Sequence, residues 1–120
     1  MEKELIRVLD FAEYPGVRYI EQGDDTGEEF YNKKIKPLFE KCVAENKKLV
    51  VDLDGTAGYA SSFLDECFGN LVYDFEYKDI IERLEIISLE ESDWKDIIFN
   101  ETLPEWLKKK NDGQPRKQTS

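Results

Sequence analysis

The sequence has no histidine and only two cysteines among its 120 residues. Structural zinc sites are usually built from these two residue types, so such a site would need an unusual ligand set here. The lack of histidine also excludes the side chain that most often acts as a catalytic acid or base at neutral pH. Cys42 and Cys67 both fall on apolar faces of expected helices, where a free thiol usually serves as a small core hydrophobe. We expect no cofactor.

Long apolar runs and an excess of positive charge are also missing. No run approaches the length of a membrane span, and the first residues lack the apolar core and cleavage site of a signal peptide, so we expect a cytoplasmic protein without a membrane partner. The 27 acidic residues outnumber the 17 basic ones and give a net charge of -10. This charge disfavours nucleic acid as the main partner and favours a basic protein instead.

Residues 50–75 carry the clearest pattern in the chain. The apolar run at residues 49–51 is typical of a strand buried on both faces, and Asp52, Gly55 and Gly58 then interrupt it as turn residues do. After this loop, apolar residues recur at the spacing of one helix face. They are Phe63, Leu64, Cys67, Phe68, Leu71, Val72 and Phe75. The stretch predicts a strand, a glycine-containing loop and a helix, and open α/β sheets bind their ligands at such loops.

Ser62 lies where the N-cap of this helix is expected. Its side chain could accept a hydrogen bond from the first turn, and Asp65, three residues later, resembles the second residue of a capping box. The sequence therefore predicts a structural role for Ser62 that needs no partner.

The first part of the chain predicts one or two strands and a helix. Residues 4–11 favour a strand, and residues 17–20 favour a second short strand that would pair with it as a hairpin across a Pro-Gly turn. Thr26 and Glu29 then form a capping box before a helix. Its apolar positions are Phe30, Tyr31, Ile35, Leu38, Phe39, Cys42 and Val43. Pro37 predicts a kink inside this helix.

The last part of the chain predicts a helix, a strand and a second helix. Residues 77–84 favour a short helix and residues 85–89 a strand. A last helical region runs over residues 94–110, and Pro104 is expected to restart it. Residues 111–120 are polar, basic and rich in turn formers, which predicts a disordered tail.

This order of elements predicts an α/β fold. Strands separated by helices usually form right-handed crossovers, so we expect a small, mostly parallel sheet covered by helices, which becomes mixed if the hairpin forms. Residues 1–110 would form one domain, which is large enough to bury a core without metals or disulfides.

Asp52 and Asp54 lie in the pentapeptide Asp-Leu-Asp-Gly-Thr directly after the central strand. This loop resembles the first motif of haloacid-dehalogenase-type phosphatases, and the resemblance would make Asp52 the nucleophile, Asp54 the general acid/base and both of them magnesium ligands. The other site residues of that family have no evident place in the rest of the chain. The structural alternative is that both carboxylates shape the turn through local hydrogen bonds to the backbone.

A wider set of motifs resembles another family. Five blocks carry the resemblance, and they span residues 16–89 in the order that this family has. They are Gly16-Val17-Arg18-Tyr19, Thr26-Gly27-Glu28-Glu29-Phe30, Val50-Val51-Asp52-Leu53-Asp54-Gly55-Thr56-Ala57-Gly58-Tyr59, Ser61-Ser62-Phe63-Leu64-Asp65-Glu66 and Phe68-Gly69-Asn70-Leu71. Together they look like the bacterial STAS-like domain family of unknown function, which is distantly similar to the anti-sigma-factor antagonists.

The resemblance implies a non-enzymatic regulatory module that binds another protein. In the antagonists, a serine in the corresponding loop is phosphorylated by a histidine-kinase-like ATPase, and by position that serine would be Ser62. Arg18 and Tyr19 are either part of the interaction face or ordinary surface residues. The resemblance implies a partner-binding face made of Gly58, Tyr59, Ser61, Ser62, Phe63, Asp65 and Glu66. The identity of the partner, the pathway and the oligomeric state stay open.

Overall fold

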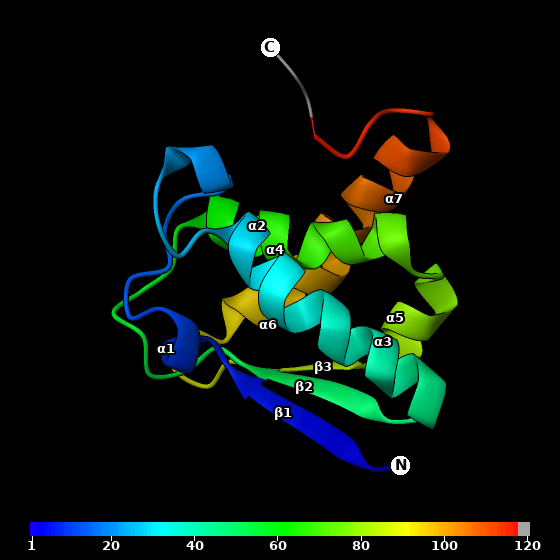
Figure 1. Ribbon diagram of the computed structural model, residues 1–120, viewed down its shortest axis with the longest axis horizontal. Helices are drawn as coiled ribbons and strands as arrows, with labels where there is room; N and C mark the ends of the chain where they lie inside the picture. Colours follow the sequence, from blue (N-terminus) through cyan, green and yellow to red (C-terminus); the bar gives the residue numbers. More distant parts are fainter. Residues whose placement is uncertain (118–120) are drawn as a thin grey trace.

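Three parallel strands form a single sheet in the computed structural model, which describes residues 1–117 (Figure 1). The strands are β1 (Lys3–Arg7), β2 (Lys48–Asp52) and β3 (Leu84–Ile87), and they lie in the order β1-β2-β3. The apolar β2 therefore lies in the centre, with both of its edges bonded to a neighbour. The predicted α/β class is confirmed, and the sheet is entirely parallel.

Helices make up most of the remaining chain. They are α1 (Val8–Phe11), a 3₁₀ turn (Ile20–Gln22), α2 (Gly27–Phe30), a π-helical turn (Tyr31–Ile35), α3 (Lys36–Glu45), α4 (Ser61–Asp74), α5 (Tyr77–Arg83), α6 (Asp93–Ile97), a second π-helical turn (Ile98–Thr102) and α7 (Leu103–Asn111). Figure 1 shows the large helices stacked over one face of the sheet. Because the strands lie in sequence order, right-handed crossovers place the connecting helices on that same face.

Pro37 and Pro104 each lie inside a helix that continues on both sides of the proline. The helix that starts at α2 contains Pro37, and its π-helical turn ends at Ile35, two residues earlier. The helix that starts at α6 contains Pro104, and its π-helical turn ends at Thr102, again two residues earlier. Because proline lacks an N–H and crowds the preceding turn, a wider turn just before it accommodates the ring. The helix therefore does not restart at Pro104 as the sequence analysis expected, because it is continuous from α6 to α7, and a kink at Pro37 stays a prediction.

The predicted hairpin is wrong. β1 ends at Arg7 and the chain turns into α1, while residues 17–20 form no strand. Instead, the carbonyl groups of Val17 and Arg18 accept hydrogen bonds, each of 2.9 Å, from the backbone N–H groups of Gly27 and Glu28. This segment thereby satisfies free donors at the start of α2, and the outer edge of β1 has no neighbouring strand within the described residues.

Helix α4 is the centre of the core. The residues of its predicted apolar stripe are buried from Phe63 to Val72, including the thiol of Cys67, and Cys42 of α3 is buried as well. Two glycines let other helices approach α4 closely. A Cβ atom on Gly27 would lie 2.5 Å from the carbonyl oxygen of Phe63, and one on Gly69 would lie 2.0 Å from the ring of Trp106.

The chain stays in contact with the domain beyond α7. The hydroxyl of Tyr73 donates to the carbonyl oxygen of Gln114 at 2.8 Å, and Arg116 pairs with Asp74 through two hydrogen bonds. The described part of the tail therefore packs on α4, although the sequence predicts disorder for it. Residues 118–120 of that tail lie outside the described residues, and the boundary of the domain stays a prediction.

Candidate functional site

The loop after β2 is held against residues 13–18 by backbone hydrogen bonds. The N–H of Ala57 donates to the carbonyl of Glu13 at 2.9 Å, and the N–H of Ala60 donates to the carbonyl of Pro15 at 3.1 Å. Two segments that are far apart in the sequence thus form one surface at the N-terminus of α4. This is the part of the fold where the sequence predicts the functional residues.

Ser62 is not the cap of α4, so the capping prediction is wrong. The helix begins one residue earlier, and Ala60 occupies the N-cap position without a side chain that could cap it. Ser62 therefore lies inside the first turn, and its hydroxyl donates to the carbonyl oxygen of Gly16 at 3.1 Å. Asp65 lies too far along the helix to complete a capping box. The half-buried Ser62 instead fastens α4 to the segment before α2.

Asp52 and Asp54 serve as acceptors for the backbone. The Asp52 carboxylate accepts from the N–H of Asp54 at 2.9 Å, and the Asp54 carboxylate accepts from the N–H groups of Leu89 and Glu90 at 2.9 and 3.0 Å. The Asp52 bond is local, as the turn-shaping interpretation expects. The Asp54 bonds are not local, since they tie the end of β2 to the loop after β3. Asp54 therefore acts as a structural acceptor at the place where the phosphatase alternative needs a reactive carboxylate. Among the described residues, the acidic and cysteine side chains form no group of three that could hold a metal ion.

The predicted partner-binding residues divide into exposed and buried ones. Ser61 is exposed, and Gly58 and Asp65 are partly exposed. Phe63 is fully buried and Glu66 is only 3% exposed, so both side chains pack inside the domain and are not available for contact with a partner.

Tyr59 is also tied to the domain, by a hydrogen bond of 2.7 Å from its hydroxyl to the carbonyl oxygen of Leu53. Its ring lies edge-on to Trp94, with 6.4 Å between the ring centroids.

Arg18 links this surface to the interior of α4. Its Nη1 donates to Asp65 at 2.7 Å and to Glu66 at 3.1 Å, and Asn70 donates to the second oxygen of Glu66 at 2.6 Å. The indole N–H of Trp106 donates to the other oxygen of Asp65 at 3.1 Å. The sequence analysis missed Asn70 and Trp106, although the i, i+4 spacing of Glu66 and Asn70 is a pattern that favours such a bond on a helix.

Burial and hydrogen bonding within this network shift the pKa values of Glu66 and Arg18. Burial raises the pKa of the Glu66 carboxyl, and the hydrogen bonds from Asn70 and Arg18 offset only part of that effect. Burial also opposes the charge on Arg18, but its hydrogen bonds and attraction to Asp65 and Glu66 outweigh this and raise its pKa. The guanidinium group therefore stays charged and compensates a carboxylate that is almost completely removed from solvent.

A groove of about 200 Å³ opens beside Ser61. Its apolar lining comes from three side chains on two helices, Leu64 of α4 and Trp94 and Ile97 of α6. Carboxylates border it, and these belong to Asp65, Glu101 and Glu105.

A second hollow of about 430 Å³ continues past Trp94 and Ile97. It is lined by Glu90, Glu91 and Asp93, so it is acidic as well. The sequence analysis did not anticipate that α6 and α7 would contribute to this surface.

Comparison with known protein families matches residues 26–94 to a family described as a STAS-like domain of unknown function. The match covers more than half of the chain and runs from the cap of α2 to the first turn of α6, so the chain belongs to this family. The predicted family is thereby confirmed. Neither the curated proteins nor the solved structures include a match to this chain. Within residues 1–117, no helix is both long and apolar enough to cross a membrane.

Proposed function

We propose that this domain is a non-enzymatic regulatory module of the cytoplasm, and that it binds another protein through the groove beside Ser61. The observation that carries the proposal is the groove itself, which combines an apolar lining of Trp94 and Ile97 with an acidic border. Apolar hollows bordered by polar groups are typical of interaction sites. The groove also adjoins the loop where the resemblance to the antagonists places partner binding.

The charges around the groove indicate a basic partner surface. Arg18 is the cation in its lining, and it is already paired with Asp65 and Glu66. Lysine or arginine side chains of a partner would therefore meet carboxylates such as those of Glu101 and Glu105, which form no ion pair within residues 1–117. Such complementarity speeds association and disfavours other partners. Following the resemblance, we propose a histidine-kinase-like ATPase as the partner.

Ser62 is the proposed point of control. A phosphate on its hydroxyl would replace the hydrogen bond to Gly16 and place negative charge close to Asp65. Both changes would loosen residues 13–18 from α4 and alter the wall of the groove.

Site-specific photo-crosslinking tests the proposed function. A photoreactive residue in place of Ser61 should capture a defined partner in native cell extract, and the same residue in place of the exposed Glu82 on α5 should not. The captured protein, identified by mass spectrometry, should then bind the purified domain directly. Crosslinks that are the same from both positions, or a partner that fails to bind the purified domain, would contradict the proposal.

A further inference from the structure

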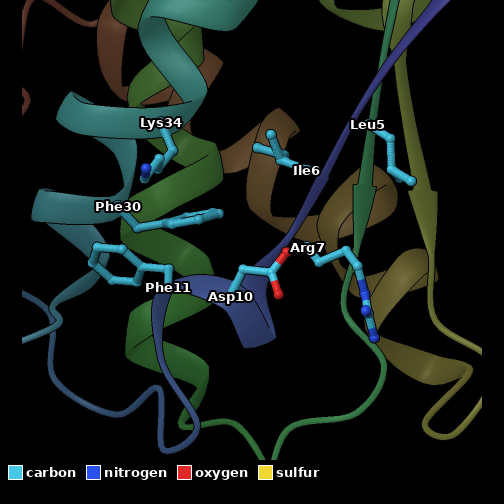
Figure 2. A pocket seen from close by; sticks show the side chains of 7 residues that line it. All are labelled: Leu5, Ile6, Arg7, Asp10, Phe11, Phe30 and Lys34. Carbon is cyan, nitrogen blue, oxygen red and sulfur yellow. The ribbon is translucent and has the colours of Figure 1, made fainter.

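A hollow of about 180 Å³ beside β1 and the end of the chain differ in their charges. Figure 2 shows that the hollow is lined by the rings of Phe11 and Phe30 and by groups of both charges, which are Arg7, Asp10 and Lys34. This mixed lining favours neither an acidic nor a basic ligand. At the end of the chain, by contrast, a basic segment lies against acidic and aromatic side chains. Figure 1 shows this segment beyond α4, on the side of the helices away from the sheet.

Residues 113–117, called the strap from here on, lead from the end of α7 back across α4. Gly113 has a φ of 79°, and this left-handed conformation is a common way to end a helix. The hydroxyl of Tyr73 in α4 then donates to the carbonyl oxygen of Gln114 at 2.8 Å. Residues 111–115 are exposed, whereas the last two residues of the strap are half-buried. The strap is therefore held mainly at its end.

Arg116 anchors the strap to α4. Its two terminal nitrogens donate to the two oxygens of Asp74, and its guanidinium carbon lies 5.3 Å from the centre of the Tyr73 ring. Two-point pairing of this kind is the strong form of an arginine–carboxylate contact. Asp74 also accepts from the hydroxyl of the buried Tyr31, and its side chain is only 14% exposed. Arg116 thus compensates a carboxylate that is mostly removed from solvent.

Lys117 anchors residues 17–22 to the strap. Its Nζ lies 2.9 Å from a carboxylate oxygen of Glu21 and 3.7 Å from one of Glu28. The same nitrogen lies 4.5 Å from the centre of the Tyr19 ring, within the range of a cation–π contact. The strap therefore joins α4 to a segment that lies almost a hundred positions earlier in the sequence.

Residues 17–22 depend on such polar contacts for their position. Residues 20–25 are all exposed, and a segment with few buried contacts opens at a low cost in free energy. Arg18 ties the segment to two carboxylates of α4, and Lys117 ties it to the strap through Glu21. A loss of the strap would therefore leave Arg18 on a segment with one anchor fewer.

We propose that the strap is a releasable clasp, which the charges of Arg116 and Lys117 hold closed and which fixes residues 17–22 against α4. Exposed ion pairs are weak and are screened by salt, so the strap can open while α7 stays packed on α4 through the buried Trp106.

The strap also affects the groove beside Ser61, because Arg18 lies in the lining of that groove. Opening of the strap would free this part of the wall to move. The strap itself does not depend on the proposed function, and its test needs only the free chain.

Hydrogen exchange at two backbone amides reports on residues 17–22. The N–H groups of Gly27 and Glu28 donate to carbonyl groups of this segment at 2.9 Å, so they exchange faster when the segment moves away. In the full chain with both Arg116→Gln and Lys117→Gln, these two amides should exchange at least about fivefold faster than in the wild type, measured by NMR.

Two controls separate opening of the strap from other effects of the substitutions. The amides of β2, which is bonded on both edges, report on unfolding of the core and should keep their exchange rates. The double variant with Lys34→Gln and Lys78→Gln loses the same charge from two exposed positions outside the strap, and its Gly27 amide should exchange as in the wild type.

Salt tests the same contacts without any substitution. A rise from about 0.05 M to about 0.5 M salt should speed exchange at Gly27 and Glu28 relative to β2 in the wild type, because it screens both cations of the strap. In the chain with Arg116→Gln and Lys117→Gln the effect of salt should be clearly smaller.

The proposal is overturned if Gly27 and Glu28 keep their wild-type exchange rates when Arg116 and Lys117 are both replaced. It is also overturned if the amides of β2 speed up by the same factor, since the strap would then only add to global stability. An equal effect of the control variant, or an equal effect of salt on the wild type and the strap variant, would likewise overturn it.

Discussion

The guanidinium group of Arg18 reaches the carboxylate of Glu66, 48 positions later in the sequence, and holds it at 3.1 Å although Glu66 is only 3% exposed. This contact joins the segment before α2 to the interior face of α4. It sets the position of the whole surface around Ser61, because the neighbouring Ser62 bonds to the same segment.

Arg18→Met should lower the free energy of unfolding by about 2–4 kcal/mol at pH 7, because it leaves a buried carboxylate without its cation. Urea denaturation followed by circular dichroism measures this. Glu66→Gln is the control, since it removes the charge and keeps the hydrogen-bonding capacity. In that background Arg18→Met should cost clearly less, and an equal cost in both backgrounds would show that the two side chains are not coupled.

The same pair predicts a pH dependence. Burial already raises the pKa of Glu66, and loss of Arg18 should raise it further, because one of the groups that stabilise the charged form is gone. A carboxyl with a raised pKa in the folded state favours folding at low pH and loses that contribution as the pH rises through the shifted value. The cost of Arg18→Met should therefore be larger at pH 7 than at pH 4. A cost that is constant across this range would contradict the raised pKa.

Gly69→Ala should destabilise the protein by about 1–3 kcal/mol or more, because the new methyl group would overlap the ring of Trp106. Gly16→Ala is the control, since a Cβ atom there has its nearest neighbour at 3.9 Å and the backbone is not in the left-handed region. Thermal melts compare the two. In a Trp106→Leu background the cost of Gly69→Ala should shrink, and if it does not, the ring is not the cause.

The cap position of α4 can be tested with two small changes. Ala60→Ser supplies a side chain at the N-cap, where the structure has none, and should stabilise the protein by about 0.5–1 kcal/mol. Ser62→Ala removes only the hydrogen bond to Gly16 and should cost about 0.5–1.5 kcal/mol. Chemical denaturation gives the free energy of unfolding of both variants and so shows whether residue 60 or residue 62 is the N-cap of α4. No gain from Ala60→Ser would argue that the helix starts elsewhere.

The core should depend on its aromatic residues more than on its thiols. Phe68 is fully buried, and Phe68→Ala should cost roughly 3–5 kcal/mol through the cavity that it leaves. Cys42→Ser and Cys67→Ser should each cost about 1–3 kcal/mol if the hydroxyl finds no partner. Differential scanning calorimetry of the three variants checks this order. A melting temperature of Phe68→Ala equal to that of the wild type would contradict the packing of α4.

Elements with a strong local signal could be predicted from the sequence. The apolar residues of α4 recur with the period of a helix, and they are buried as this period predicts. Thr26 caps α2 by accepting a hydrogen bond from the N–H of Glu29, as its capping box indicates. The run at residues 49–51 likewise lies in the buried central strand.

Features that arise from tertiary contacts could not be predicted. Residues 17–20 have the composition of a strand, but their carbonyl groups bond to the start of α2 and Arg18 turns toward Asp65. The groove joins Leu64 to Trp94 and Ile97, which lie about thirty positions later, and no periodicity connects such distant residues. The resemblance also put Phe63 and Glu66 in the partner-binding face, whereas α4 turns both side chains inward, as the apolar stripe had indicated for Phe63.

The affinity of the purified partner for two matched variants tests the binding function most directly. Ile97→Arg places a cation in the groove, where it would repel a basic partner surface. Ile81→Arg places the same cation on α5, where Ile81 is 50% exposed and does not line the groove. Isothermal titration calorimetry on both folded variants should show binding weakened at least about tenfold by Ile97→Arg and unchanged by Ile81→Arg. Equal affinity of Ile97→Arg and the wild type would contradict the groove as the binding site.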